Sequence, residues 1–415
     1  MLVLDLTHTS HTPARTGIQR VARALYFNLR DKAVPVTRDP FVGAWRPLES
    51  WELTNLANSQ GGEKRKARWP ASAKWRGRFR RALGRTPAHA LHGEFDGLIE
   101  PELFGPPVAR DFAKLFAHIH GPRVALFLDA IPLRFPELTP PGTVARFPGY
   151  MRELLMFDGI AAISEESRDS LLDYWQWLGE RNPPPVVALP LGVDLVATAA
   201  AGDARPGSSE SIGSPRDGGL ERPARRSGAA LQPEIPIVLC VGTLEGRKNH
   251  LALLDACERL WSAGERFQLR LIGHVNAETG GAALARARAL QAAGQPIRFD
   301  GPATDEEIVR AYAECTFTVY PSIAEGFGLP VIESLARGKP CICSGHGALG
   351  EISNAGGCIA LATLNADSLA SGIARLLHDP SELQALQADA RTRTFKSWVG
   401  YTGELITWMQ SLTRR

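Results

Sequence analysis

The sequence lacks long apolar runs and the marks of a secretion signal. No apolar stretch approaches the length of about 18 residues that a transmembrane helix needs, so we expect no membrane-spanning segment. The N-terminal residues, Met1–Leu6, are apolar but short, and they carry neither a basic region nor a cleavage site. A first β-strand is therefore a better interpretation of this segment than a signal peptide.

Cysteine is scarce and is confined to the second half of the chain. All six cysteines lie beyond residue 239. Cys240 and the pair Cys341/Cys343 fall in apolar, strand-like runs, where buried and reduced thiols are typical. The C-x-C spacing is neither that of a zinc site nor that of a thioredoxin motif, and no second cysteine pair complements it. We therefore expect a reducing compartment and no structural metal.

Acidic residues are absent between Lys64 and Arg85, where ten lysines and arginines gather. The formal net charge of the whole chain is only +3, so the rest of the chain is net acidic. The run belongs to an insertion that we assign to residues 55–92. Contact with an anionic membrane surface and a solvated, partly disordered insertion explain it equally well. Nucleic-acid binding is less favoured, because the remaining chain is acidic and shows no nucleic-acid-binding fold.

An aromatic pattern runs through these cations. Trp75, Phe79 and Leu83 recur at intervals of four residues, which would place them in one stripe on a helix. The cations between them include Lys74, Arg76, Arg78, Arg80 and Arg81. Gly77 should weaken such a helix. On the membrane hypothesis, the contact residues are Trp75, Phe79, Arg76 and Arg80.

Elsewhere apolar strand candidates alternate with amphipathic helical stretches, which predicts parallel sheets covered by helices on both faces. The length of 415 residues favours two domains. The expected strands are 2–6, 124–128, 159–163 and 186–190, then 237–241, 268–272, 317–320 and 340–343, and 17–29 is expected as a helix. Residues 197–236, rich in Gly, Ser, Pro, Ala and Arg, are predicted to form a disordered linker. The domains are then 1–196 and 237–395, with a helix in 396–415 packing back on the first.

The segment Glu325-Gly-Phe-Gly-Leu-Pro-Val-Ile-Glu333 carries the strongest functional signal. It follows an expected strand and precedes a helix that Pro330 can start. A strand, a glycine loop and a helix N-terminus together form an anion site, because backbone N–H groups and the helix dipole favour negative charge. Its donor-binding residues would be Gly326, Phe327, Gly328 and Leu329, with the glycines permitting close approach.

The two carboxylates of this segment have separate expected roles. Glu333, in the first helical turn, can accept hydrogen bonds from ribose hydroxyls, and Glu325 faces the cleft where sugar hydroxyls would lie. The structural alternative is a Gly-Pro turn followed by a glutamate that complements the helix dipole. The combination of strand, glycine loop and helix favours the functional interpretation.

With this motif, the chain resembles the family-four retaining glycosyltransferases of the GT-B fold, which carry an E-x7-E motif. The resemblance extends to Val241-Gly-Thr-Leu-Glu-Gly-Arg-Lys-Asn249, Ile163-Ser-Glu165 and Leu191-Gly-Val-Asp194. It implies two Rossmann-like domains that face each other across a donor cleft. It also implies that Lys248 contacts the donor diphosphate, Glu325 the transferred sugar and Glu333 the ribose. No metal would be obligatory, since protein cations and amides stabilise the leaving diphosphate.

Three further residues complete the expected site. Gly17, in Thr16-Gly-Ile-Gln-Arg20, resembles the family's glycine loop in the N-terminal domain. Arg247 is a candidate donor-binding cation, with a plain surface arginine as the alternative. Asp129 is a candidate for a catalytic carboxylate that holds a sugar or acceptor hydroxyl, and a strand-end carboxylate in a turn is equally compatible with its position.

Two positions depart from the family pattern. Leu128 stands where many relatives have a histidine near the transferred sugar, and Thr243 where many have an arginine that holds the diphosphate. A leucine side chain donates no hydrogen bond, so that contribution must be absent or supplied elsewhere. The sequence alone does not identify residues that replace this histidine and this arginine.

The function that follows is a retaining hexosyltransferase that uses a nucleotide-sugar and a glycan or lipid-linked glycan acceptor, with no cofactor. The tract 241–249 is most similar to mannosyl- and rhamnosyltransferases of surface polysaccharide assembly, so GDP-mannose is the first donor to consider. We expect a cytoplasmic protein, peripheral at the inner face of the membrane if the basic run binds lipid. The alternatives are a catalytically weakened binding or scaffold subunit, motivated by Leu128 and Thr243, and an epimerase or phosphorylase with the same fold.

Overall fold

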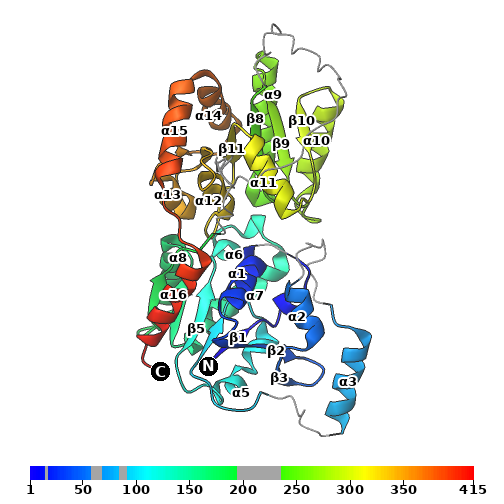
Figure 1. The fold of residues 1–415 in the computed structure, drawn as a ribbon, viewed down its shortest axis with the longest axis vertical. Coiled ribbons are helices and arrows are strands. Elements are labelled where there is room, and N and C mark those ends of the chain that lie inside the picture. The colour runs from blue at the N-terminus through cyan, green and yellow to red at the C-terminus, as the bar shows by residue number, and fades with distance from the viewer. Residues whose placement is uncertain (15–16, 58–67, 84–90, 194–234) are drawn as a thin grey trace, which may run out of the picture.

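The computed structural model describes residues 1–14, 17–57, 68–83, 91–193 and 235–415. Two α/β domains are stacked end to end, the N-terminal one below and the C-terminal one above in Figure 1. Most of the linker expected at 197–236, and the basic residues Lys64–Lys66 and Arg85, lie outside the described residues. Within the described chain, no helix combines the length and the apolar character needed to cross a bilayer.

The N-terminal domain is built on a seven-stranded sheet in the order β3-β2-β1-β4-β5-β6-β7. All neighbouring strands are parallel except β2 and β3, which form an antiparallel pair at the edge. The strands are β1 (Leu2–Asp5), β2 (Ala33–Asp39), β3 (Ala44–Pro47), β4 (Gly97–Glu100), β5 (Arg123–Phe127), β6 (Gly159–Ala162) and β7 (Val186–Ala188).

Helices connect these strands. They are α1 (Gly17–Asn28), α2 (Ser50–Ala57), α3 (Ala71–Ala82), α4 (Pro106–Ala109), α5 (Phe112–Phe116), α6 (Ile131–Arg134), α7 (Pro141–Glu153) and α8 (Glu165–Trp177), with short 3-10 turns at Thr9–His11, Pro136–Leu138 and Leu154–Met156. Ser164 begins α8 as its N-cap, because its side chain accepts a hydrogen bond from the Ser167 N–H.

The C-terminal domain has a fully parallel six-stranded sheet in the order β10-β9-β8-β11-β12-β13. Its strands are β8 (Ile237–Val241), β9 (Gln268–Ile272), β10 (Ile297–Phe299), β11 (Phe317–Tyr320), β12 (Cys341–Ser344) and β13 (Cys358–Leu361). Its helices are α9 (His250–Ser262), α10 (Gly281–Ala292), α11 (Asp305–Glu314), α12 (Leu329–Leu335), α13 (Gly347–Ser353), α14 (Ala366–His378) and α15 (Pro380–Thr392), with a 3-10 turn at Gly246–Lys248.

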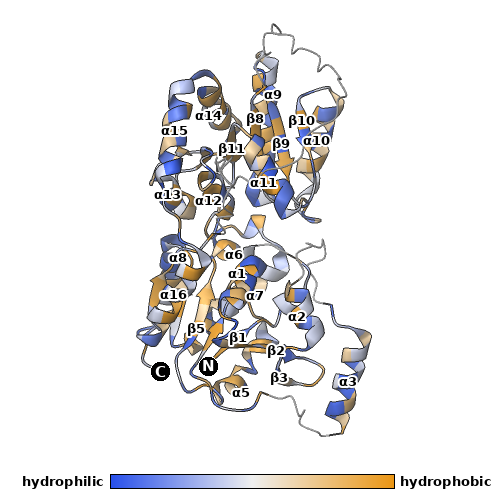
Figure 2. Cartoon of the chain, in the orientation of Figure 1, coloured by the Kyte–Doolittle hydropathy of each residue, from blue (hydrophilic) through white to orange (hydrophobic). Residues whose placement is uncertain are grey.

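The predicted fold class, α/β with two Rossmann-like domains, is therefore confirmed. Apolar residues colour strands such as β5 and β9 in Figure 2, while the outer faces of helices such as α15 are polar. This distribution follows from parallel strands that are covered on both faces and therefore consist almost entirely of apolar residues.

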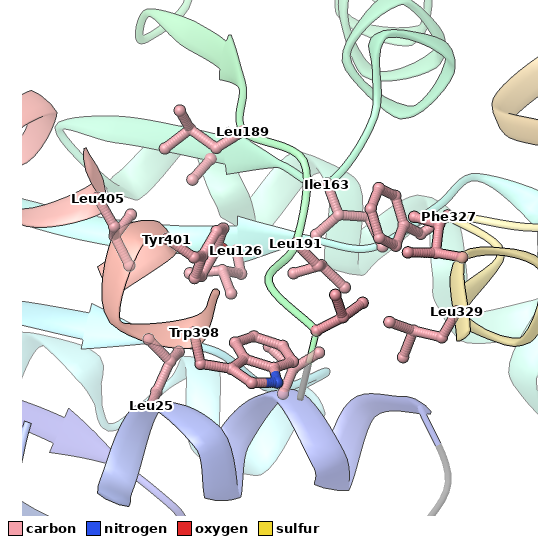
Figure 3. Packing of buried hydrophobic residues seen from close by; sticks show 14 of the residues in the cluster. Leu25, Leu126, Ile163, Leu189, Leu191, Phe327, Leu329, Trp398, Tyr401 and Leu405 are labelled. Carbon is pink, nitrogen blue, oxygen red and sulfur yellow. The ribbon is translucent and has the colours of Figure 1, made fainter. Parts of the chain in front are cut away.

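The last helix, α16 (Trp398–Gln410), returns to the N-terminal domain and packs near α1. Trp398 and Tyr401 belong to the same buried cluster as Leu25. The cluster also includes Phe327 and Leu329 of the C-terminal domain, which point toward Ile163 and Leu191 in Figure 3. The two domains thus share continuous apolar packing at their junction.

The structure changes the description of the basic insertion expected at 55–92. Leu56 and Leu91, near its two ends, are buried in the core. Trp69 stacks on His11 with ring centroids 4.0 Å apart, so it belongs to the body of the domain. Gly77 lies inside α3, and the helix continues through it. A β-carbon at this position would lie 2.7 Å from the Cβ of Phe41, so the glycine allows α3 to approach the β2–β3 loop.

Candidate active site

Glu325 is the centre of a compact polar cluster in the loop that follows β11. Its Oε1 accepts a hydrogen bond from the Tyr320 hydroxyl at 3.0 Å and another from Ser322. The same oxygen pairs with Arg247 Nη1 at 2.7 Å and with the ammonium of Lys248. The glutamate expected to hold the transferred sugar and the lysine expected to hold the diphosphate are therefore direct neighbours.

Charge pairing determines the ionisation of this cluster. Burial would by itself raise the pKa of Glu325, but Arg247 and Lys248 overcome that effect and lower it to about 2. Burial lowers the pKa of Lys248, and the Glu325 carboxylate offsets part of that change. Glu325 is therefore an anion throughout the neutral range, and it accepts hydrogen bonds without donating any.

Arg247 is oriented toward the same site by its backbone surroundings. Its Nη1 donates to the Ala324 carbonyl at 3.0 Å, and its Nη2 pairs with Glu245 at 2.9 Å. Its own carbonyl accepts the Ile323 N–H at 2.9 Å, which ties the 3-10 turn to the loop after β11. The surface-arginine alternative is wrong, because the guanidinium contacts Glu325. A cation thus stands in the site although Thr243 replaces the usual arginine.

Asp129 faces this cluster from the N-terminal domain, at the end of the segment that follows β5. One oxygen, Oδ1, accepts the Ile131 N–H at 3.0 Å, as a carboxylate in a turn would. Burial raises the pKa of Asp129, and Arg247 partly counteracts this. Asp129 therefore has the expected turn contact and lies within electrostatic reach of the C-terminal cluster, and its role toward a sugar or acceptor hydroxyl stays a prediction.

Gly326 is the point of closest approach between the domains. A β-carbon on it would lie 2.3 Å from the Leu128 carbonyl oxygen and 3.1 Å from Asp129 Cβ. The Gly326 carbonyl accepts a hydrogen bond from the Ser164 hydroxyl at 2.8 Å, and the Ser167 hydroxyl oxygen lies 3.3 Å from it. This glycine is required because another backbone occupies the space of a side chain.

A second contact between the domains lies beside the first. The Glu351 carboxylate of α13 accepts the backbone N–H groups of Glu165 at 3.1 Å and Glu166 at 2.7 Å. These are the first residues of α8, where an anion is favoured by the unpaired N–H groups and the helix dipole.

Sequence reasoning missed Glu351, Ser167, Tyr320 and Ser322. A polar residue at a strand end was the available signal for Tyr320, and none was available for Glu351.

Glu333 lies away from Glu325 and pairs with Arg20 of α1. Helix α12 begins at Leu329 and places Pro330 at its second position, so Glu333 follows the first turn, one residue later than expected. The side chains of Phe327 and Leu329 are buried in the shared core, and this leaves only their backbone groups for a ligand. Gly328 adopts a φ of 109°, a conformation that glycine permits.

Gly17 is the first residue of α1 and is exposed. No atom outside its own neighbourhood lies within 4 Å of the place where its β-carbon would be. The structure thus does not bring Gly17 into contact with the C-terminal cluster. Its helix nevertheless carries Arg20, three residues later, to Glu333.

A cavity of about 150 Å³ opens between the domains next to Glu325. The N-terminal domain lines it with residues that include Asp129, Arg134 and Glu166, and the C-terminal domain contributes Glu325 and His346. The described residues contain no group of three or more His, Cys, Asp or Glu placed to hold a metal ion. A cavity between two facing Rossmann-like domains, lined by apolar surface with a few charged groups, is a typical place for a small-molecule site.

Comparison with known proteins agrees with this geometry. Residues 221–393 match the family model described as glycosyl transferases group 1. The chain is 25% identical over 352 residues to the serotype-specific mannosyltransferase WbdA of Escherichia coli, which covers 82% of this chain and 38% of WbdA. It is 32% identical over 171 residues to the O-antigen chain mannosyltransferase B of Escherichia coli, covering 40% of this chain and 44% of that protein. The chain thus spans less than half the length of these relatives.

Among solved structures, the crystal structure of Anabaena Alr3699/HepE in complex with UDP-glucose superposes with a TM-score of 0.66. The match covers 99% of this chain and 100% of that one at 14% sequence identity, so it is evidence for the fold alone. The family model lies on the domain that carries Lys248, Glu325 and Glu333. The C-terminal domain is therefore similar to group 1 glycosyltransferases, and the chain as a whole has a two-domain GT-B fold.

Proposed function

We propose that the chain transfers a hexose from a nucleotide-sugar to a glycan or lipid-linked glycan, with retention of anomeric configuration. The observation that supports this most is Glu325, which lines the interdomain cavity together with Asp129 and pairs with Arg247 and Lys248. This cluster combines cations for a diphosphate with an ionised acceptor for sugar hydroxyls in a buried setting.

The cations act on the leaving group. Negative charge grows on the diphosphate as the bond between sugar and phosphate breaks, and preorganised donors lower that barrier. The Lys248 ammonium has three N–H donors, of which Tyr320 and Glu325 engage two, so one can still be directed to a phosphate oxygen. Arg247 supplies a planar guanidinium suited to phosphate in the same place.

The carboxylates act on hydroxyl groups. Glu325 is ionised and held by four neighbours, so it can accept hydrogen bonds from the transferred sugar with little rearrangement. Glu333 would accept hydrogen bonds from the ribose of the donor. Asp129 would hold a hydroxyl of the sugar or of the acceptor, on the N-terminal side of the cavity where acceptors are expected.

Mannose is the first sugar to test, with GDP-mannose as the donor. The support is the similarity of 241–249 to mannosyl- and rhamnosyltransferases and the printed names of the two Escherichia coli relatives. The fold neighbour was crystallised with UDP-glucose, so uridine donors belong in the same test. We place the reaction in the cytoplasm, at the inner face of the membrane if the acceptor is lipid-linked.

A catalytically weakened nucleotide-sugar-binding subunit is the alternative. Leu128 motivates it, since its side chain offers no hydrogen bond where many relatives have histidine. Its backbone carbonyl accepts the Ser167 hydroxyl at 2.9 Å, within the N-terminal domain. An epimerase would also bind the donor, but it has no need of a second, acceptor substrate.

A thermal-shift screen followed by a turnover assay tests the proposal. A ligand that binds only the folded state raises the melting temperature by mass action, so the donor is found by comparing GDP-mannose, other GDP- and UDP-sugars and the free nucleotides. We expect the best donor to release nucleoside diphosphate only when a glycan acceptor is added. Donor binding without acceptor-dependent release would favour the binding subunit, and no shift with any nucleotide would overturn the proposal.

A further inference from the structure

Helix α3 exposes three large apolar side chains on one side. Trp75 is 70% exposed, Phe79 66% and Leu83, which follows the helix, 51%. They are spaced four residues apart and so form one stripe, which we call the α3 stripe (Trp75, Phe79 and Leu83). Single exposed apolar residues are ordinary, but a contiguous aromatic stripe on a monomer marks an interaction surface.

The opposite side of α3 is fixed to the domain. Ala73 and Gly77 are its buried residues, and each lies two positions from Trp75, on the far side of the helix. Gly77 packs against Phe41 so closely that a β-carbon there would lie 2.7 Å from Phe41 Cβ. The α3 stripe therefore cannot turn inward without losing this contact, and it stays directed away from the protein.

Cations flank the α3 stripe on both sides. Arg76 lies on one side and Arg78 on the other, as a repeat of 3.6 residues per turn requires. Arg76 reaches Glu49 at 2.9 Å, and the Arg78 guanidinium lies 5.7 Å from the centre of the Phe41 ring. Helix α3 contains no acidic residue. The surface thus combines an apolar centre with a positively charged border.

We propose that the α3 stripe and its flanking arginines dock the protein on an anionic lipid surface. The helix would lie in the plane of the interface, with Trp75 and Phe79 at the boundary of headgroups and acyl chains and Arg76 and Arg78 among the phosphates. In Figure 1 α3 lies at the edge of the N-terminal domain, apart from the C-terminal domain. Docking there leaves the donor domain clear of the lipid surface.

The charges favour lipid over the other partners for such a surface. A second copy of the chain would bring two sets of arginines together, and like charges in an interface cost several kcal/mol. A nucleic acid would use the arginines but has no apolar layer to receive a stripe that projects Trp75 and Phe79. An anionic bilayer complements both features at once.

Sedimentation with vesicles of phosphatidylcholine, alone or mixed with phosphatidylglycerol, tests the proposal on the whole protein. We expect pelleting with the mixed vesicles only, and weaker pelleting at 1 M salt than at 0.1 M, where the screening length is about 3 Å and about 10 Å respectively. The double variant Trp75→Ser/Phe79→Ser keeps the charge and should bind the mixed vesicles about tenfold more weakly. Arg76→Gln/Arg78→Gln keeps the aromatics and should lose a similar factor.

Trp177→Ser is the matched control, because Trp177 is 78% exposed on α8, a helix that carries four acidic residues and a single arginine. It should pellet like the unaltered protein, and unchanged melting temperatures would show that all variants are folded. Equal pelleting of the unaltered protein and Trp75→Ser/Phe79→Ser overturns the proposal. So does retention on heparin without pelleting, or a concentration-dependent dimer that the serine variant abolishes in the absence of lipid binding. None of these readouts depends on which sugar is transferred.

Discussion

Arg20 of the N-terminal domain and Glu333 of the C-terminal domain form an ion pair that bridges the two domains. The Arg20 side chain is 40% exposed and that of Glu333 only 12%, so the pair lies where solvent reaches one partner. Arg20 engages Oε1 of the carboxylate. A ribose hydroxyl that approaches Glu333 must therefore share this carboxylate with Arg20 or displace it.

Replacing Glu333 with glutamine should weaken donor binding. Loss of a charge-assisted hydrogen bond to the ribose corresponds to roughly 1.5–3 kcal/mol, which is about a tenfold or larger increase in Kd. Calorimetry with the preferred nucleoside diphosphate measures it. Glu306→Gln, an exposed glutamate in the first turn of α11, is the control and should bind normally. Unchanged affinity in Glu333→Gln would remove Glu333 from the site.

Replacing Lys248 with methionine should slow turnover more than it weakens donor binding. Methionine keeps much of the side-chain volume but removes the cation that would stabilise the charge developing on the diphosphate. Removal of one such donor typically lowers kcat about 100- to 1000-fold. Initial rates at saturating donor test this, with Lys114→Met, whose side chain is 66% exposed, as the control. A normal rate in a folded Lys248→Met protein would falsify this role.

Lowering the pH should remove part of the folding stability that the ionised Glu325 side chain confers. Its pKa is about 2 in the folded protein against an ordinary 4.5, so its stabilisation is complete above about pH 4.5 and is lost as the pH falls toward 2. Glu325→Gln removes the carboxylate that pairs with Lys248 and with Arg247 Nη1, while Arg247 keeps Glu245. Removing one partner of a buried pair costs about 3–5 kcal/mol.

Thermal melts of Glu325→Gln and the unaltered protein should therefore differ most at neutral pH and converge below pH 4.5. Glu137→Gln alters an exposed glutamate and should match the unaltered protein throughout. A difference in melting temperature that is the same at pH 7 and pH 3 would contradict the assignment of the stabilisation to an ionised Glu325.

Adding one methyl group at Gly326 should disturb the contact between the domains. The new β-carbon would meet the Leu128 carbonyl oxygen at 2.3 Å, so the loop or the whole domain must move. We expect Gly326→Ala to lower both the melting temperature and the affinity for the donor. Gly403→Ala is the control, since Gly403 lies in α16 with open space around it and alanine favours a helix by about 1 kcal/mol. Equal behaviour of the two variants would show that Gly326 tolerates a side chain.

Much of the fold could be predicted from local sequence. Strands β8, β9 and β11 have the predicted bounds, because central parallel strands are continuous apolar runs between turns. Strand β4 was not predicted, since it begins with Gly97 and ends with a buried glutamate, Glu100. Strands β2 and β3 were missed for the related reason that they contain polar residues, such as Thr37 and Arg38 in β2.

The candidate site could be predicted only where its parts are close in sequence. Glu325 and Glu333 stand in one short motif, and their roles stay predictions. Arg20 and Glu333 are 313 residues apart, and Ser164 and Gly326 are 162 apart. Such contacts depend on how the two domains pack against each other, and no local sequence pattern predicts that packing. Arg247 was the candidate cation that sequence alone could offer in place of the arginine missing at Thr243, because it lies only four residues later, in the 3-10 turn Gly246–Lys248 that follows β8.

The return of α16 to the N-terminal domain has a consequence for biosynthesis. Residues 398–410 leave the ribosome only after the entire donor domain has been made, yet Trp398, Tyr401 and Leu405 are buried in the cluster that also holds Leu25. The N-terminal domain is translated first, yet its apolar core is complete only after the C-terminal domain has been made. Until then its nascent chain presents an uncovered apolar surface, and this is a state in which chaperones bind and premature termination leaves an aggregation-prone product.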